Sequence, residues 1–472
     1  MIRKLSTYLL LILSPLGLAA QYISEVLEYV PAPGQFINST PWGTPVSVNS
    51  LLGGVNGSLS LGAFGGSVVF RFEEAVENHP DNPYGMDFTI FGNATSEWSE
   101  PGVVWVMKDE NGNNLPDDIW YELAGSDYHF STTQREYEVN YTNPGGEEAR
   151  DVPWSDSFGN SGLIKANSVH TQPYYPLADS FPDVSMESYS LSGTLIRGAV
   201  DVDHPPLIKS LRRSFAYADN QIRGSGSHTI PDNPYTPEVE HSGGDAFDIG
   251  WAVNAEGFYV DLDQIHFIKV QTGVLHEGGW LGEISTEITG AVDVAPDHTI
   301  AGMLDLLVIQ DLPAEVDTGS IQLECYMFYM GRPVSLPQIQ WTSSEEWASV
   351  DENNTAFISG SGTLTLTAMV IGEPSLTATV STLVIPEVQV GFASKEFQSG
   401  LTLYPNPSRD QVHVSGVEQV NLYIYESSGK MLQRVENYMA GDAINIQWLS
   451  PGFYLLKVGE GRSASFLKLL KQ

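Results

Sequence analysis

The sequence predicts an all-β protein built from consecutive β-sandwich domains. Short runs rich in β-branched and aromatic residues recur along the chain, among them SVVFRF, DFTIFG, IHFIKVQTG, TLTLTAMV and FYLLKV, and clusters of Gly, Pro, Asn and Asp separate them. The chain holds 45 Gly and 28 Pro, and no long segment repeats its apolar residues at the helical period. Because 42% of the 472 residues are hydrophobic, the chain has enough apolar surface for several cores.

Residues 1–20, MIRKLSTYLLLILSPLGLAA, are typical of a secretory signal peptide. Arg3 and Lys4 precede an apolar run, and small residues at 17–20 predict cleavage after Ala19 or Ala20. No cysteine stands directly after the cleavage zone, where the usual bacterial lipid anchor would require one. No other apolar run approaches the ~20 residues of a membrane span. We therefore expect Sec export and a mature chain without a membrane span.

The charge balance limits the partners of the chain. Lys and Arg number 22 against 58 Asp and Glu, which gives a net charge of −36. A chain this acidic repels nucleic-acid phosphates and anionic lipid headgroups. No nucleic-acid partner is therefore expected, whereas divalent cations are favoured.

Residues 21–302 form the largest predicted domain, and its segment KDENGNNLPDDIWYEL at 108–123 joins two strand-like runs. If Asp109 is position 1, oxygen-bearing side chains fall at positions 3, 5 and 9, and position 7 offers a backbone carbonyl. A loop of this pattern folds its oxygens around one centre, and Ca²⁺ takes six to eight oxygens at ~2.3–2.6 Å. The pattern predicts a structural calcium site whose ligands are Asp109, Asn111, Asn113, Leu115, Asp117 and Asp118.

Two departures from the EF-hand pattern leave a second interpretation open. Asn114 stands at position 6 in place of Gly, although Asn tolerates the left-handed conformation. Trp120 stands at position 12, so Asp118, Glu122 or Glu100 would have to complete the shell. The alternative is a plain hairpin turn at Asn111-Gly112. The three carboxylates of the loop would repel one another without a cation, which favours calcium.

Other candidate site residues carry weaker patterns. Asp245 and Asp248 in GGDAFDIGW alternate with large apolar residues, which predicts buried carboxylates that either form a second acidic metal site or staple a loop. Four aromatic residues could stack on a ligand, namely Trp98, Trp120, Tyr121 and Trp280. The sequence lacks HExxH, GxSxG and P-loop motifs, and no carboxylate pair stands out among the 58, so we assign no catalytic residue.

Residues 303–388 are predicted to form an Ig-like β-sandwich. Thr363, Thr365 and Thr367 alternate with apolar residues, as in a half-buried strand. Cys325, the only cysteine, lies on the apolar face of another predicted strand, which predicts a buried thiol. The segments QIQWTSSEEWASVDENN and GSGTLTLTAMV resemble a bacterial Ig-like group 2 repeat. The resemblance implies a spacer or an adhesive stalk.

Residues 389–396 are predicted to be a linker, and residues 397–472 a small C-terminal β-sandwich. The last segment holds seven Lys/Arg and six Asp/Glu, whereas residues 21–396 hold thirteen and fifty-two, and so sharp a shift indicates a domain boundary. LTLYPNPSRD, VNLYIYESSGK, LSPGFYLLKV and FLKLLK resemble the type A C-terminal sorting domain of type IX secretion substrates from Bacteroidetes. The resemblance implies the type IX machinery as a partner, passage through the outer membrane, and removal of the domain with release or surface attachment.

The domain at 21–302 carries a resemblance of its own. LGAFGGSVVFRFEEAVEN, SEPGVVWVMKDENGNNLPDDIWYELAGS and GGDAFDIGWAVNAEGFYVDLDQIHFIKVQTG are similar to an uncharacterised group of cell-surface proteins from Bacteroidetes. The resemblance implies a jelly-roll-like β-sandwich. It also implies an outer-membrane uptake receptor as a partner, with cobalamin among the candidate nutrients.

Three functions are compatible with these observations. The leading hypothesis is a non-enzymatic binding protein, secreted or displayed at the surface, that is stabilised by calcium and recognises a glycan or another nutrient. The second is a jelly-roll glycan hydrolase or lyase, which requires two carboxylates roughly 5–10 Å apart in a cleft. The third is an adhesin or a surface-layer component. An acidic cleft would favour the enzyme and an aromatic platform would favour the binding protein.

Overall fold

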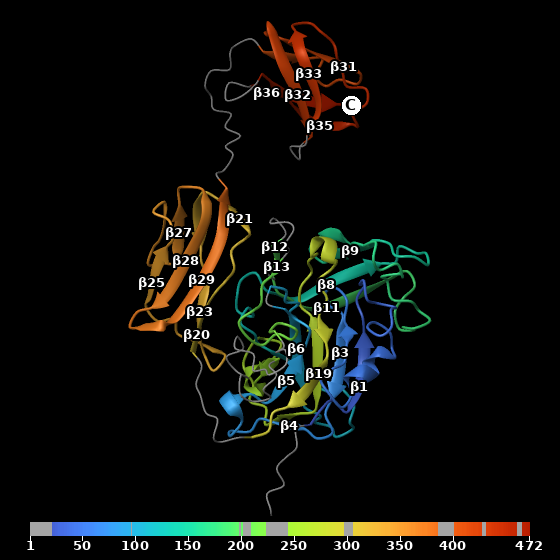
Figure 1. The fold of residues 1–472 in the computed structure, drawn as a ribbon, viewed down its shortest axis with the longest axis vertical. Coiled ribbons are helices and arrows are strands. Elements are labelled where there is room, and N and C mark those ends of the chain that lie inside the picture. The colour runs from blue at the N-terminus through green and yellow to red at the C-terminus, as the bar shows by residue number, and fades with distance from the viewer. Residues whose placement is uncertain are drawn as a thin grey trace, which may run out of the picture. The chain divides into compact units, whose positions relative to one another are not determined.

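The computed structural model describes residues 21–95, 97–197, 200–201, 209–222, 244–296, 305–385, 401–426, 431–459 and 465–472. The predicted signal peptide and the linker at 389–396 lie outside these residues. Every regular element in these ranges is a β-strand or a short 3-10 helix, which confirms the all-β prediction (Figure 1). The 3-10 helices are η1 (Ser47–Leu51), η2 (Pro83–Gly85), η3 (Ile249–Trp251) and η4 (Gly279–Leu281). The chain divides into two compact units, Met1–Ile385 and Pro386–Gln472.

A six-stranded sheet is the centre of the larger unit. Its strands, from one edge to the other, are β1 (Glu25–Val30), β3 (Ser67–Arg71), β17 (Phe267–Thr272), β6 (Gly102–Met107), β7 (Trp120–Leu123) and β15 (Ala252–Val253). All its pairings are antiparallel, and Val270 lies opposite both Val68 and Val104. These side chains point to the same face of the sheet, because facing residues in neighbouring strands share a side.

One face of this sheet packs against a three-stranded sheet, and the two enclose the main core. The second sheet has the order β14 (Asp245–Phe247), β5 (Phe88–Phe91) and β19 (Gly290–Asp293). Phe70 and Val106 from the larger sheet meet Phe88, Ile90 and Phe247 in one apolar cluster. This is a β-sandwich, with apolar residues at alternate strand positions on both inner faces.

The opposite face of the six-stranded sheet is partly covered by a four-stranded sheet. Its order is β10 (Ser161–Ile164), β9 (Val152–Asp156), β8 (Gln134–Thr142) and β11 (Ser188–Leu195). β11 crosses the central sheet, because Gln271 donates to the Ser192 carbonyl at 3.0 Å and Thr194 donates to Glu122 at 2.6 Å. Three two-stranded ladders complete this body: β2 (Leu59–Ser60) with β18 (Glu287–Ile288), β4 (Val76–Glu77) with β16 (Gln264–Ile265), and β12 (Val200–Asp201) with β13 (Lys209–Ser210).

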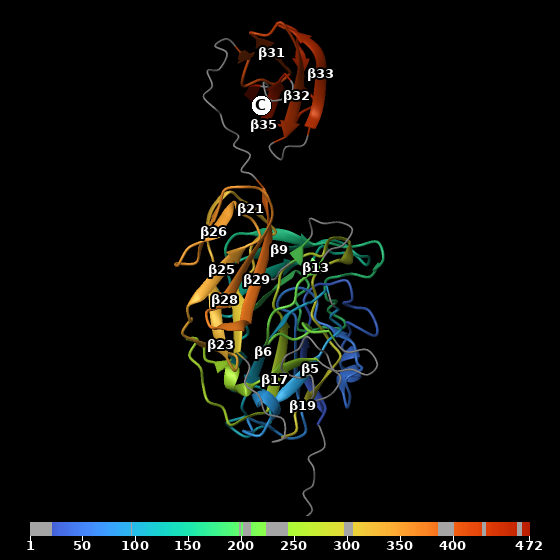
Figure 2. The same cartoon turned by 60° about the vertical axis from the view of Figure 1, so that its left-hand side comes forward.

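Residues 305–385 form sheets and an apolar core of their own, seen as yellow and orange strands in Figures 1 and 2. The sheets are β20 (Asp305–Ile309), β23 (Cys325–Tyr329) and β24 (Arg332–Val334); β21 (Glu315–Asp317), β29 (Glu373–Ile385), β28 (Gly362–Val370) and β25 (Ile339–Ser343); and β22 (Gly319–Gln322), β27 (Thr355–Ile358) and β26 (Ala348–Val350). Leu364, Leu366 and Ala368 are buried in β28, as the alternation predicts. Cys325 is buried too, and burial raises the pKa of its thiol to about 11.

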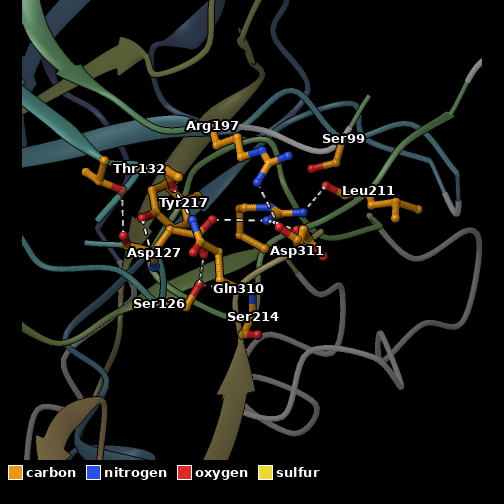
Figure 3. A network of polar contacts seen from close by, with 12 residues as sticks. Ser99, Ser126, Asp127, Thr132, Arg197, Leu211, Ser214, Tyr217, Gln310 and Asp311 are labelled. Atoms are coloured by element: carbon orange, nitrogen blue, oxygen red, sulfur yellow. Dashed lines mark hydrogen bonds and ion pairs between the residues drawn. The ribbon is translucent and has the colours of Figure 1, made fainter. Parts of the chain in front are cut away.

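This segment also packs tightly against the preceding body. Phe328 of β23 is buried in the main core, where its ring contacts that of Phe215 with centroids 5.1 Å apart. A polar network joins the two parts beside it (Figure 3). The buried Arg213 guanidinium forms ion pairs with Asp127 at 3.0 Å and with Asp311, and Arg197 donates to the Asp311 carbonyl at 3.0 Å. The domains predicted at 21–302 and 303–388 therefore pack together within one compact unit, as far as residue 385.

The smaller unit holds two sheets around a separate apolar core. One contains β30 (Thr402–Tyr404), β31 (Gln411–Ser415) and β34 (Ile444–Asn445), and the other β33 (Met431–Met439), β32 (Gln419–Glu426), β35 (Gly452–Val458) and β36 (Ser465–Lys471). Val412, Val414, Leu422, Ile424 and Leu456 form the centre of this core. The unit is thus a small β-sandwich, as the sequence predicts.

Candidate metal sites and a surface pocket

The predicted calcium loop connects the two strands of a β-hairpin. β6 and β7 pair antiparallel with Met107 opposite Trp120, so the intervening residues leave and re-enter the sheet at the same level. Gly112 and Asn114 have φ values of 71° and 59°, which agrees with the expectation that Asn114 adopts the left-handed conformation. The hairpin and the metal loop are therefore compatible descriptions of one segment.

The carboxylates of the loop accept hydrogen bonds from its own backbone. Asp109 accepts from the N–H groups of Gly112 at 2.7 Å, Asn113 at 3.2 Å and Asn114 at 2.9 Å. Desolvation acts to raise the pKa of Asp109, but these hydrogen bonds outweigh it and leave the pKa below its ordinary value. Asp118 accepts from the N–H of Glu110 at 3.0 Å. The loop is thus folded around its acidic side chains.

Side-chain amides complete this arrangement. Asn111 and Asn113 each donate to Asp117, at 3.0 Å for the shortest contact of each, and the Leu115 carbonyl accepts from the Asp117 N–H at 2.9 Å. The structure therefore brings together all the residues of the predicted ligand set. In this arrangement the two amides present nitrogen to Asp117, and a calcium ion would require them to present oxygen instead.

Glu100 and Glu122, which could have completed the calcium shell, lie elsewhere. Glu122 is buried on β7, where it accepts from the Thr194 hydroxyl at 2.6 Å. Burial raises the pKa of Glu122 to about 7. Glu100 lies before β6 and contributes to a separate acidic cluster. Within the loop, Asp118 is the candidate that remains to complete the shell.

Asp245 and Asp248 are separate loop-holding acceptors. Asp245 is buried and accepts from the backbone N–H groups of Asn220 at 2.9 Å and Gln221 at 3.0 Å. Asp248 caps η3 by accepting from the N–H of Gly250 at 2.5 Å, and burial raises its pKa to about 7. The predicted roles were a second acidic metal site and the fixing of a loop by hydrogen bonds, and this geometry matches the second.

The candidate stacking residues do not share one surface. Trp120 and Tyr121 are consecutive in β7 and so point to opposite faces: Tyr121 packs on the main core, whereas the Trp120 ring lies 5.0 Å from the Lys269 ammonium. Trp98 packs against an apolar cluster with Val103 and Ile284. The side chain of Trp280 is outside what the structure describes. Among the residues that the structure describes, the candidate side chains therefore do not form one aromatic platform.

The structure reveals one acidic cluster that the sequence analysis missed. Glu100, Asp219 and Glu287, hereafter the buried acidic cluster, each place a carboxylate oxygen within 4.8 Å of the other two. Their exposed fractions are only 7%, 0% and 5%. Burial raises the pKa of Glu100, Asp219 and Glu287, and the charge of Glu287 adds to the effect on the first two. Such a set binds either protons or a cation.

Three distant segments build this cluster, which explains why no local pattern signals it. Glu100 precedes β6, Asp219 follows Ala218 in a loop, and Glu287 begins β18. Backbone hydrogen bonds connect them: the Glu100 N–H donates to the Asp219 carbonyl at 2.9 Å, and the Glu287 N–H donates to the Asp219 carboxylate at 2.8 Å. The sequence signal for this cluster is an acidic residue within an apolar, strand-like run such as EISTEITGAV. Such runs are too common to identify a metal site.

A surface pocket of about 400 Å³ lies along the edge strand β1. The edge strand β11 and the segment 180–184 close its other sides. Tyr29 and Tyr189 are held by their hydroxyl groups, which donate to the carbonyls of Ser60 at 2.6 Å and Pro31 at 2.8 Å. The lining consists of Val26, Leu27, Glu28, Tyr29, Val30, Pro45, Val48, Ser180, Phe181, Pro182, Asp183, Val184, Tyr189, Ser190 and Leu191.

Comparison with known proteins identifies the C-terminal unit. Residues 402–472 match the family described as the secretion system C-terminal sorting domain. No curated protein matches the chain. The chain therefore carries the sorting signal of a type IX secretion substrate and interacts with that machinery. It is a protein of the cell surface or the extracellular space. In the described residues no helix is both long and apolar enough to cross a membrane.

Solved structures similar to the chain are distant. Drosophila OTK extracellular domains 3–5 are 11% identical over 82% of this chain and 97% of that chain, with a TM-score of 0.18. The S-layer protein rSbsC(31–844) is 9% identical over 87% and 53%, with a TM-score of 0.18. Dimeric latent PorU from Porphyromonas gingivalis is 11% identical over 72% and 34%, with a TM-score of 0.12. No functional conclusion follows from scores of this size.

Proposed function

We propose that the chain is a non-enzymatic binding protein that the type IX system displays on the outer-membrane surface or releases. The domain at residues 21–302 recognises a glycan or another small nutrient. Calcium in the 109–118 loop stabilises this domain. An outer-membrane uptake receptor that accepts the nutrient is the matching partner. The proposal rests on the pocket along β1, because a concave site with apolar walls and a few polar groups is the usual form of a small-molecule site.

The pocket suits a ligand that combines rings with hydroxyl groups. The side chains of Tyr29, Phe181 and Tyr189 supply ring surface, and Glu28 and Asp183 are exposed carboxylates at its margin. Sugar faces stack on aromatic rings, and carboxylates accept hydrogen bonds from sugar hydroxyl groups. The buried acidic cluster is not part of this lining, so the carboxylates with raised pKa values do not face a ligand here. This separation favours binding over hydrolysis.

A binding screen tests the proposal. Glycans and small ring-bearing nutrients are screened against the purified protein, and each hit is measured by calorimetry. Glu28→Gln with Asp183→Asn should weaken binding at least tenfold, because a hydrogen bond to a charged group is worth about 1.5–3 kcal/mol. Asp179→Asn, an exposed carboxylate outside the lining, is the matched control and should bind as the wild type does. Equal affinity of all variants would place the ligand elsewhere, and turnover of a bound glycan would support the enzyme alternative.

Display depends on the C-terminal unit and is tested separately. A chain that lacks residues 397–472 should fold but remain in the periplasm, because the match to the sorting domain lies within the deleted segment. Immunoblots of cell fractions and surface labelling of intact cells give the result. Normal surface delivery of the truncated chain would contradict the role of the segment.

A further inference from the structure

The buried acidic cluster has the spacing of ligands around one ion. Glu100, Asp219 and Glu287 each contribute an oxygen, and these oxygens lie within 4.8 Å of one another. Two ligands on opposite sides of a calcium ion are separated by at most twice the metal–oxygen distance, or about 5 Å. All three oxygens therefore fit within a single coordination sphere.

The protein itself supplies no compensating charge to this cluster among the residues that the structure describes. The ion pairs of Lys and Arg in these ranges go to other carboxylates. Two further buried carboxylates lie nearby, since Asp245 interacts with Asp219 and Glu283 interacts with Glu287. Buried carboxylates without a partner are strongly unfavourable, and a divalent cation among them removes that cost.

A second observation comes from Glu287. Its side chain is 5% exposed, and its Oε1 atom is buried without a hydrogen-bond partner. The other two carboxylates are held by backbone donors: Asp219 accepts from the N–H groups of Asn93 at 2.7 Å and Ala94 at 2.9 Å, and Glu100 accepts from that of Ser285 at 3.2 Å. The Glu287 carboxyl group also takes part in side-chain hydrogen bonds, which join it to Glu100, Ser60, Ser285 and Asn93. Its Oε1 atom is thus the one oxygen of Glu287 that is buried without a partner, and it lies beside two carboxylates that backbone donors hold in place.

The backbone around the cluster is held in a costly conformation. Asp219 is left-handed with φ of 53°, and a Cβ at Gly92 would come within 2.1 Å of the Asp219 carboxylate. Asp245 fixes the next two residues through their N–H groups. Strain of this kind persists where the surrounding structure over-determines it, and it concentrates at ligand-binding sites.

We propose that the buried acidic cluster is a calcium site, separate from the 109–118 loop and outside the lining of the surface pocket. Its candidate ligands are the oxygens of three carboxylates, and no His or Cys belongs to the cluster. Oxygen-only sets select hard cations over zinc or copper. Calcium accepts an irregular shell of six to eight oxygens, whereas magnesium demands an octahedron and retains its waters. The site pins three segments of the core together.

Calcium content after refolding tests the proposal, because a buried ion must enter before the core closes. The protein is unfolded in guanidinium with EDTA, refolded in calcium chloride, freed of unbound ion and analysed for calcium per chain. Glu100→Gln with Glu287→Gln should contain one calcium fewer than the wild type. Asp109→Asn with Asp117→Asn should retain the buried ion. Glu73→Gln with Glu74→Gln, two exposed neighbours on the surface, is the control and should match the wild type.

The cluster variant should also refold without calcium, because it removes carboxylate repulsion, and its metal-free melting temperature should equal or exceed that of the wild type. If the double variant fails to refold, Glu287→Gln alone should show the same loss of one ion. A cluster variant with as much calcium as the wild type would overturn the proposal. So would a refolded Asp109→Asn, Asp117→Asn protein without any calcium, which would show that the carboxylates share protons instead. Failure of the loop site alone would leave the buried ion in place, so the two outcomes are distinguishable.

Discussion

The 109–118 loop and the buried acidic cluster hold the same chemical groups under opposite conditions. In the loop, the acidic residues are neighbours in sequence and exposed, and backbone and amide N–H groups satisfy them. In the cluster, the acids come from three distant segments, and water hardly reaches them. A dense acidic motif such as the loop is therefore visible in the sequence although its charges are easily satisfied, whereas the buried cluster, whose charges are costly, has no local sequence pattern.

The largest expected effect comes from Arg213, a third buried site of charged groups. Here the cation is a side chain of the protein, so its contribution to stability can be measured by substitution. Arg213 is 7% exposed and pairs with the buried Asp127 and with Asp311. Arg213→Met would leave Asp127 and Asp311 without their cation, and breaking a buried pair costs about 3–5 kcal/mol. Urea unfolding followed by tryptophan fluorescence measures the loss. Lys209→Met, whose pair with Glu97 is exposed, is the control and should cost about 0–1 kcal/mol. A small loss in both variants would show that burial does not set the cost of these charges.

The next effect is the pH dependence of the stability that Glu122 causes. It shows the effect of burial on a carboxyl group that does not belong to the acidic cluster. Burial raises the pKa of this carboxyl to about 7, although the hydrogen bond from Thr194 and the charges of Arg135 and Lys269 act in the opposite direction. The folded state keeps a proton that the unfolded chain releases, so stability should fall as pH rises from about 4.5 to 7 and then level off. The loss is about 3 kcal/mol, at 1.36 kcal/mol per pKa unit. Glu122→Gln should remove this part of the pH profile in chelator, whereas the exposed Glu138→Gln should not. An unchanged profile for Glu122→Gln would mean that the carboxyl is ionised when folded.

Much of the architecture could be predicted from the sequence, because strand alternation and turn residues act locally. The buried alternate positions of β28 and the left-handed Asn114 follow from such local rules. The contacts of Phe328 and Arg213 with the preceding body could not be predicted, since they depend on how two sandwiches meet. The buried acidic cluster was missed for the same reason. Local patterns specify elements and loops, but they do not specify which elements share a core.

Calcium at the exposed loop should produce an effect of similar size under saturating conditions. At a hundredfold excess over the dissociation constant, an ion that binds only the folded state adds about 2.7 kcal/mol. The melting temperature should therefore fall in chelator and recover with calcium, and magnesium should restore it poorly. Asp109→Asn with Asp117→Asn should reduce the calcium response. In chelator this variant should be less stable than the wild type, because Asp109 also accepts three backbone hydrogen bonds. A response equal to that of the wild type would reduce the loop to a hairpin turn.

The smallest effect tests whether calcium binds the loop in the conformation seen here. Gly112 is left-handed with φ of 71°, and a Cβ there would meet open space. Gly112→Ala should therefore cost about 1–2 kcal/mol from backbone strain alone. Gly145→Ala is the matched control, since Gly145 has φ of 69° and equally open surroundings outside the 109–118 loop. If calcium binds the present conformation, the cost of Gly112→Ala should be the same in chelator and in calcium, as it must be for Gly145→Ala. A cost that grows for Gly112→Ala only in calcium would show that the bound loop demands a tighter left-handed turn. A cost that vanishes in calcium would show that the ion rebuilds the loop and that the hydrogen bonds around Asp109 belong to the calcium-free state.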